Sequence, residues 1–180
     1  FSHFGFSKTT LTEIADDLSM SRQLFLYYFH DKNNLIAAVI ERLIGEFHGI
    51  TETRLLEART VADGLTGLLD VRKEFILKYS LLAIQAERLD VAKNPHLQTI
   101  ITRSFRKSMG LVSGLLDRGI AAGEVRELNT RKTAKTILQA IAAYDHCLSF
   151  KNGLPQKDAL ENIHRSKKEL ITLIVNGLRK

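Results

Sequence analysis

The sequence contains few residues that break helices or cross-link a chain. Of its 180 residues two are proline, Pro95 and Pro155, and none is tryptophan. The single cysteine, Cys147, excludes an intrachain disulfide framework and is typical of a reducing compartment, so we expect a cytoplasmic protein. Because Leu, Ala, Ile, Lys and Glu are abundant, this scarcity of helix breakers predicts an all-α fold.

Long apolar runs are also lacking. The longest are about six residues, as at 35–40, whereas a membrane-spanning helix needs about 20. We therefore expect no membrane segment.

The first fifty residues lack the positive charge that the rest of the chain carries. They contain four basic and six acidic residues, a net charge of −2, whereas the whole chain carries +6. Net charge therefore gives no support to nucleic-acid binding by this segment. Such a function has to be argued from a local motif.

No catalytic or metal site is predicted. His146 and Cys147 are adjacent, so on a helix their side chains diverge by about 100°. His96 and His164 stand alone, although a zinc site needs several Cys or His at short spacing. A glycine-rich phosphate loop is absent too. We expect neither an enzyme nor a bound cofactor.

Hydrophobic periodicity predicts a series of helices. Two short ones flank Ser19 and Met20, and longer ones are expected over 33–56, from 60 towards the Asn94-Pro95 break, and over 96–116, 130–150 and 157–178. Gly110 and Gly114 fall inside the 96–116 helix. There they indicate close helix packing or room for a ligand, since each costs about 1 kcal/mol against Ala.

The stretch from Thr9 to Lys32 is the most informative. Thr10 and Glu13 fit a capping box that starts a short helix, and Leu11, Ile14, Ala15 and Leu18 form its apolar stripe. Ser21 can cap the second helix. In that helix Phe25 and Phe29 point inward, while Arg22, Gln23, Leu26 and Tyr27 point outward.

Asp31 is expected to cap the next helix and to place Lys32 in its first turn. The helix dipole disfavours a cation there, so Lys32 makes sense if an anion such as a DNA phosphate shares the site. The alternative is a solvated lysine with no ligand.

This stretch resembles the N-terminal region of the tetracycline-repressor (TetR) family of regulators. The resemblance rests on the following positions: Gly5, Phe6, Thr10, Ile14, Ala15, Met20, Ser21, Phe25, Tyr27, Tyr28, Phe29, Lys32 and Leu35. Three features depart from the family pattern. Ser19 replaces the usual turn glycine, Leu26 replaces a phosphate-contacting tyrosine, and a basic lead-in is missing.

The resemblance implies a three-helix helix-turn-helix domain (1–45) joined to a larger helical ligand-binding and dimerisation domain (46–180). It implies a homodimer that binds double-stranded DNA at a palindromic operator, most often as a repressor, and responds to a small-molecule effector. The expected DNA contacts are Arg22, Gln23 and Tyr27 in the groove, and Thr10, Thr12, Tyr28 and Lys32 on phosphates, with Ser21 at the helix start.

The rest of the chain carries two weaker sets of expectations. A ligand pocket is predicted from Phe75, Tyr79, Phe105, Met109, Tyr144 and His146, although each could equally be ordinary core. A dimer interface is predicted from Ala134, Ile137, Ile141, Leu170 and Ile174. The alternative function is a helical small-molecule- or protein-binding module that does not bind an operator.

Overall fold

The computed structural model describes residues 1, 4–79, 82, 94–147 and 157–180. Its helices are α1 (Gly5–Lys8), α2 (Leu11–Asp17), α3 (Arg22–Phe29), α4 (Lys32–Glu57), α5 (Val61–Lys78), α7 (Pro95–Ala121), α8 (Thr130–Cys147) and α9 (Lys157–Leu178). Within these residues no strand forms beyond an isolated bridge between Val125 and Arg179. The all-α prediction is confirmed. In the same residues no helix has both the length and the apolarity to cross a bilayer.

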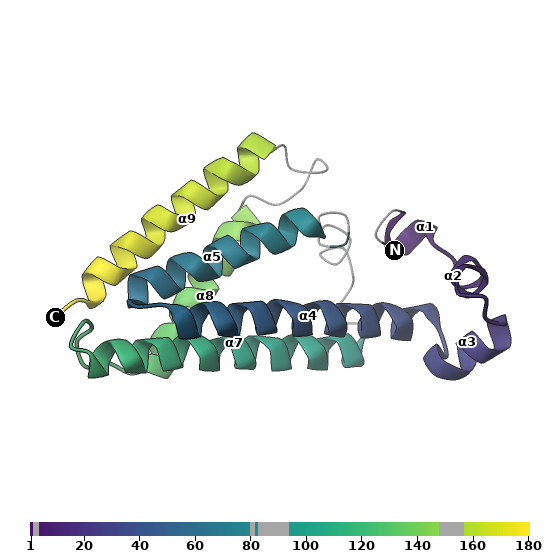
Figure 1. The fold of residues 1–180 in the computed structure, drawn as a ribbon, viewed down its shortest axis with the longest axis horizontal. Coiled ribbons are helices and arrows are strands. Elements are labelled where there is room, and N and C mark those ends of the chain that lie inside the picture. Colours follow the sequence, from purple (N-terminus) through teal and green to yellow (C-terminus); the bar gives the residue numbers. More distant parts are fainter. Residues whose placement is uncertain (2–3, 80–81, 83–93, 148–156) are drawn as a thin grey trace.

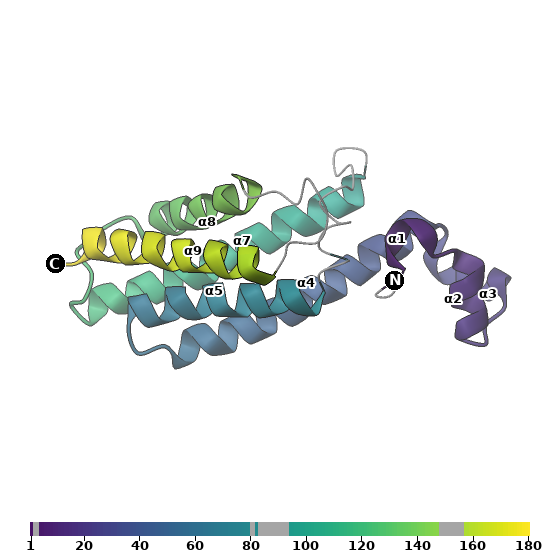
Figure 2. The ribbon, with the colours of Figure 1, turned by 90° about the horizontal axis from the view of Figure 1, so that it is seen from above.

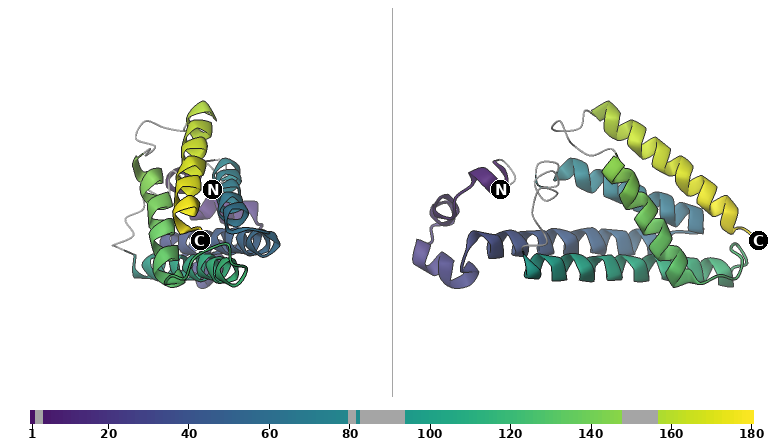
Figure 3. Two further views of the ribbon diagram at one scale, coloured as in Figure 1. Left: turned by 90° about the vertical axis from the view of Figure 1, so that its left-hand side faces the viewer. Right: turned by 180° about the vertical axis from the view of Figure 1, so that it is seen from behind.

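The helices form two parts joined by α4. Helices α1–α3 and the first turns of α4 make a small head at one end of the molecule (Figure 1). The rest of α4 lies with α5, α7, α8 and α9 in a larger body, and the C-terminus lies at the end far from the head (Figures 1 and 2). Seen from behind, α4 and α7 lie side by side along the body, with α8 and α9 crossing it (Figure 3).

Polar contacts hold α4 and α7 in a parallel arrangement. Glu41 pairs with Arg103 near the head, and Glu52 lies 3.4 Å from the Lys107 ammonium farther along. At the far end, Arg118 donates a hydrogen bond to the Leu55 carbonyl at 2.6 Å.

Side-chain caps fix where most helices begin. The Thr60 hydroxyl accepts from the backbone N–H of Asp63 at 3.0 Å, and the Asn94 side chain accepts from Leu97 at 3.0 Å, with Pro95 following as the first helical residue. Such caps satisfy N–H groups that a helix start leaves without a partner. They explain why the predicted helix starts agree with the structure so closely.

Three successive apolar clusters lie along α4. Its first turn contributes Leu35 to the head core, with Ala15 and Phe25. One residue later, Ile36 joins a cluster with Phe6 of α1 and Leu82 of the body, which we call the joint cluster. Leu55 then belongs to the main body core, which comprises Val61, Leu65, Leu68, Leu69, Val112, Leu115, Leu116, Val125, Ala134, Ile137, Ile141, Ile171 and Val175. One helix therefore packs in all three.

Two predicted elements have different ends in the structure. Helix α5 ends at Lys78 instead of continuing to the Asn94-Pro95 break; apart from buried Leu82, the remainder of that prediction lies outside the described residues. The Tyr79 hydroxyl, just beyond α5, donates to the Glu46 carboxylate of α4 at 2.9 Å. Helix α7 extends to Ala121, and Gly123 follows it with a left-handed φ of +74°.

The glycines of α7 fall into two groups. A Cβ on Gly119 would overlap Val61 Cγ2 and lie 3.2 Å from Val125 Cγ2. Around Gly110 and Gly114, apart from the adjoining residues and the backbone of the same helix, no described atom lies within 4 Å of such a Cβ. Close packing explains Gly119, whereas among the described residues no close packing is found for Gly110 and Gly114, where it was expected.

A matched pair of substitutions in α7 tests this difference. We expect Gly119→Ala to destabilise the protein by about 1–3 kcal/mol, because the stiff and buried Val61 cannot move away easily. Gly110→Ala should be neutral or stabilising by up to about 1 kcal/mol, from helix propensity alone. Urea denaturation followed by circular dichroism measures both, and equal effects would contradict the packing described here.

Candidate nucleic-acid interface and ligand cavity

A complete capping box starts α2. The Thr10 backbone N–H donates to the Glu13 carboxylate at 2.6 Å, and the Glu13 N–H donates to the Thr10 hydroxyl at 3.1 Å. The backbone hydrogen bond from Thr10 lowers the pKa of the Glu13 carboxyl below its usual 4.5. Thr10 and Thr12 are both exposed at this end of α2.

The turn after α2 is a Schellman motif built around Ser19. The Met20 N–H donates to the Ala15 carbonyl at 2.8 Å, and the Ser19 N–H donates to Asp16 at 3.0 Å. Ser19 has a φ of +54°, the left-handed conformation that favours glycine. Met20 packs against the head core with Ala15. The turn therefore forms with Ser19 at the left-handed position where the family pattern has glycine.

Helix α3 has one buried face and one open face. The Ser21 hydroxyl caps it by accepting from Leu24 at 3.2 Å. Phe25 is buried, and its ring lies 5.1 Å from that of Phe29. On the outside, Tyr27 is 75% exposed and Tyr28 63% exposed.

Arg22 and Gln23 are also exposed, in the first turn of α3. Leu26 is half-buried. The predicted outward side chains Arg22, Gln23 and Tyr27 are therefore all exposed among the described residues.

Lys32 has a partner that the sequence did not indicate. Its ammonium donates to the Ser7 carbonyl at 3.3 Å, which links the start of α4 to α1. Asp31 caps α4 as expected, accepting from the Asn34 N–H at 2.7 Å. Lys32 is half-buried rather than fully solvated.

The body contains a cavity of about 480 Å³ between its helices and the head. Most of its walls are apolar, and it is lined by Phe6, Ile40, Leu43, Ile44, Phe47, Leu69, Arg72, Lys73, Phe75, Ile76, Tyr79, Leu82, Ile101, Ser104, Phe105, Ser108, Leu138, Ala142, Leu160, Ile163, His164 and Lys167. Its size is typical of small-molecule sites. Phe6 comes from α1, so the cavity reaches the head.

The predicted pocket residues have different positions. Phe75, Tyr79 and Phe105 line the cavity. Met109 packs against the body core instead, and Tyr144 is half-buried but not among the lining residues. The prediction for His146 concerns a side chain outside the described part of the chain.

Sequence reasoning missed the basic side chains of the cavity. Arg72 and Lys73 of α5 and His164 and Lys167 of α9 come from helices far apart in the sequence. The only feature of the sequence that could have indicated them is their spacing on the inner faces of two amphipathic helices. His164 donates to Asp70 at 2.8 Å, and burial lowers its pKa below the usual 6.5, with a smaller contribution from the nearby Lys168.

A second histidine lies behind the opposite wall. The buried His48 contacts the Ser108 hydroxyl at 3.1 Å and that of Ser104 at 3.4 Å. Burial lowers its pKa as well. Among the described residues no group of three or more His, Cys, Asp or Glu could hold a metal ion.

Three of the predicted dimer residues lie in the core of this chain. Ala134, Ile137 and Ile141 of α8 are 0%, 2% and 2% exposed and pack in the body core, so they present no side chain to a second copy. Their stripe faces α7 and the rest of the body. Leu170 and Ile174 of α9 are half-buried, and their neighbour Leu173 is 71% exposed.

Together, the head and the body consist of a helix-turn-helix, with an exposed second helix beside a capped first helix, and a helical domain with a cavity. Residues 1–39 match the sequence profile of the bacterial regulatory proteins of the tetR family, and the resemblance to that family is thereby confirmed. No curated protein matches the chain in sequence.

Solved structures with this fold cover almost the whole chain. A transcriptional regulator from Cytophaga hutchinsonii has a TM-score of 0.85 at 19% identity, over 99% of this chain and 92% of its own. A TetR-family transcriptional regulator from Pectobacterium atrosepticum has a TM-score of 0.76 at 19% identity, over 99% of this chain and 88% of its own. A TetR transcription regulator from Haloarcula marismortui has a TM-score of 0.72 at 16% identity, over 99% of this chain and 92% of its own. The chain shares the fold of these transcriptional regulators.

Ser19→Gly tests the strain in the turn. We expect it to raise the free energy of unfolding by about 1 kcal/mol, because glycine adopts a left-handed φ without the cost that Ser19 bears. Asp17→Gly, in the last turn of α2 where φ is negative, is the matched control and should destabilise by about 1 kcal/mol. Thermal denaturation distinguishes them, and a loss of stability in Ser19→Gly would contradict the geometry.

Proposed function

We propose that the protein is a homodimeric transcriptional regulator, a repressor, that places the two α3 helices in successive major grooves of a palindromic operator. The observation that carries this proposal is the open face of α3, where Gln23 and Tyr27 lie on the side opposite the buried Phe25 and Arg22 is exposed in the first turn. A recognition helix of this kind reads base edges in the major groove. As a regulator of transcription the protein acts in the cytoplasm, on the chromosome.

The remaining contacts go to the DNA backbone. Thr10, Thr12, Ser21, Tyr28 and Lys32 border the open face or precede α3, where they can reach phosphates. The Lys32 ammonium, held by the Ser7 carbonyl, is positioned at the start of α4, where backbone N–H groups favour an anion. Because Leu26 is half-buried and apolar, we assign the contact of α3 with the DNA backbone to its exposed neighbours Tyr27 and Tyr28.

The dimer forms through α8 and α9. The strongly exposed Leu173, with half-buried Leu170 and Ile174 beside it, supports a contact between α9 helices across a two-fold axis. A four-helix bundle of α8 and α9 from two copies would cover this surface. Gel filtration tests this dimer: we expect the elution volume of a dimer, and the elution volume of a monomer would contradict it.

The effector binds in the cavity and acts on the head through α4. Ile40, Leu43, Ile44 and Phe47 of α4 line the cavity, and the same helix carries Leu35 in the head core. Phe6 gives the cavity a second direct contact with the head. In this proposal residues 1–45 are the DNA-binding part and 46–180 the ligand-binding and dimerisation part, with Phe6, Ile40, Leu43 and Ile44 of the first part reaching the cavity of the second.

Two substitutions separate base reading from phosphate binding. Arg22→Ala should weaken binding to a selected genomic fragment by about 1–3 kcal/mol and affect a scrambled duplex much less. Lys32→Ala should weaken both duplexes alike and make the salt dependence shallower by about one unit of log–log slope. Fluorescence anisotropy over a salt series measures both. Equal losses for Arg22→Ala on the two duplexes would move Arg22 to the phosphate contacts.

The second candidate function is a helical binding module without operator binding. The observation in its favour is the acidic head, with a net charge of −2 over residues 1–50. Anisotropy of the full-length protein with genomic fragments discriminates the two, because the module would show no salt-sensitive binding to any fragment.

A further inference from the structure

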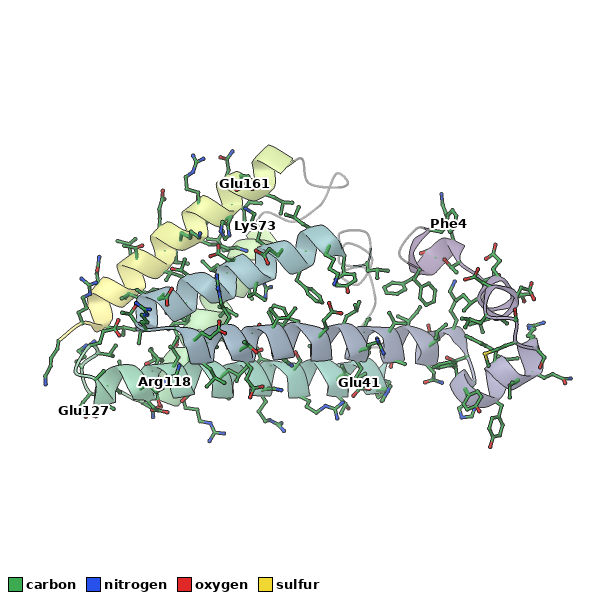
Figure 4. The ribbon with its side chains drawn as sticks, in the orientation of Figure 1. Phe4, Glu41, Lys73, Arg118, Glu127 and Glu161 are labelled. Carbon is green, nitrogen blue, oxygen red and sulfur yellow. The ribbon has the colours of Figure 1, made fainter. Side chains whose placement is uncertain are left out.

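Helix α3 exposes an aliphatic side chain that the DNA contacts proposed above do not use. Leu24 is 45% exposed, and with Tyr27 and Tyr28 it belongs to the three exposed large hydrophobic residues among the eight of this helix. The only charged residue of α3 is Arg22. Side chains project from α3 at the end of the molecule far from the C-terminus (Figure 4).

The position of Leu24 around the helix axis brings it to the side that faces DNA. Successive residues of an α-helix are about 100° apart, so Leu24 lies about 60° from Tyr27 and about 40° from Tyr28, between the two. It is also about 100° away from the buried Phe25. A helix that places Tyr27 in the groove and Tyr28 on a phosphate therefore holds Leu24 against the DNA.

Leu24 also lies in the part of α3 that reaches the bases. The N-terminal residues of a recognition helix are the ones that contact base edges, and Leu24 is the third residue of α3. Its backbone N–H donates to the Ser21 hydroxyl at 3.2 Å. This cap fixes the backbone at Leu24, and with it the direction in which the side chain leaves the helix.

Exposure alone does not single out Leu24. Isolated exposed leucines are common on protein surfaces, and Leu56, near the end of α4 in the body, is 68% exposed. Leu24 differs because of its place in the first turn of the proposed recognition helix, beside Gln23 and one turn before Tyr28. Leu56 therefore serves as a matched leucine outside the head.

The major groove offers a leucine one group to recognise. Base edges there present hydrogen-bond donors and acceptors, which an aliphatic side chain cannot bond, and one apolar group, the C5-methyl of thymine. Contact with that methyl removes apolar surface of both partners from water. Against a G·C pair the same leucine would cover polar atoms of guanine or cytosine without bonding them, which is unfavourable. Leucine at this position thus favours thymine and disfavours G·C.

We propose that Leu24 is a specificity-determining residue that packs against the C5-methyl group of a thymine in each half-site of the operator. This rests on the proposed function, because it names the base that one side chain of the same helix reads. Two copies of α3 then contact two thymines related by the two-fold axis of the operator. Each half-site therefore carries an A·T pair at the position that Leu24 faces.

Removal of the methyl group tests this contact. Duplexes that bind the full-length protein are enriched from a random library, and each thymine of the enriched half-sites is replaced in turn by 2′-deoxyuridine, which lacks only the methyl. At one position, fluorescence anisotropy should show binding weakened about four-fold for one substituted half-site and about fifteen-fold for both, as expected for one methyl group losing an apolar contact. Cytosine opposite guanine at that position should weaken binding further, and 5-methylcytosine should restore part of this loss.

A double-mutant cycle assigns the methyl contact to Leu24. Leu24→Ala should weaken binding to the thymine duplex at least as much as deoxyuridine in both half-sites does, and it should remove the effect of deoxyuridine at that position. Leu24→Met keeps an apolar side chain and should retain the effect. Leu56→Ala should change neither the affinity nor the effect of the methyl. Because Leu24 is exposed and alanine favours helix, we expect Leu24→Ala to fold, which circular dichroism checks.

The outcomes separate this proposal from the proposed function. A methyl effect that persists in Leu24→Ala, or a bound duplex without any methyl-sensitive thymine, would overturn the role of Leu24 and leave the proposed function standing. If no duplex is enriched from the library, both the proposed function and the reading of thymine are wrong.

Discussion

The structure depends on one helix that packs in three places. Helix α4 begins at the Asp31 cap, contributes Leu35 to the head core and Ile36 to the joint cluster, and reaches the body core at Leu55. With 26 residues at 1.5 Å each it is about 39 Å long. Because a continuous helix bends little, the orientation of the head is coupled to the packing of α4 in the body.

The cavity lies where this coupling can be changed. Its walls include four side chains of α4 and Phe6 of the joint cluster. A ligand shifts the balance between two head orientations only as far as it binds one of them more tightly. In the proposed mechanism, contacts with α4 and Phe6 give the ligand such a preference, since these contacts change whenever α4 moves relative to α5 and α7.

Local features of the fold could be predicted, and long-range ones could not. The Thr10–Glu13 box, the Ser21 and Asp31 caps and the inward Phe25 depend on residues a few positions apart, and the structure has them as expected. The basic wall of the cavity joins α5 to α9, and nothing local shows that Lys73 and Lys167 line the same space. In the same way, the stripe of Ile137 and Ile141 in α8 shows that one face is buried, and only the packing shows that it is buried within one chain. The functional roles assigned to the head and the cavity remain predictions.

Head spacing in the proposed dimer tests the coupling most directly. In a Cys147→Ser background, which removes the native thiol, a spin label is attached to Asp17→Cys at the exposed end of α2. Pulsed electron paramagnetic resonance then measures the distance between the labels on the two heads. The account predicts one distance distribution for the unliganded protein and a shifted one when a ligand fills the cavity. An unchanged distribution at saturating ligand would contradict the role given to α4.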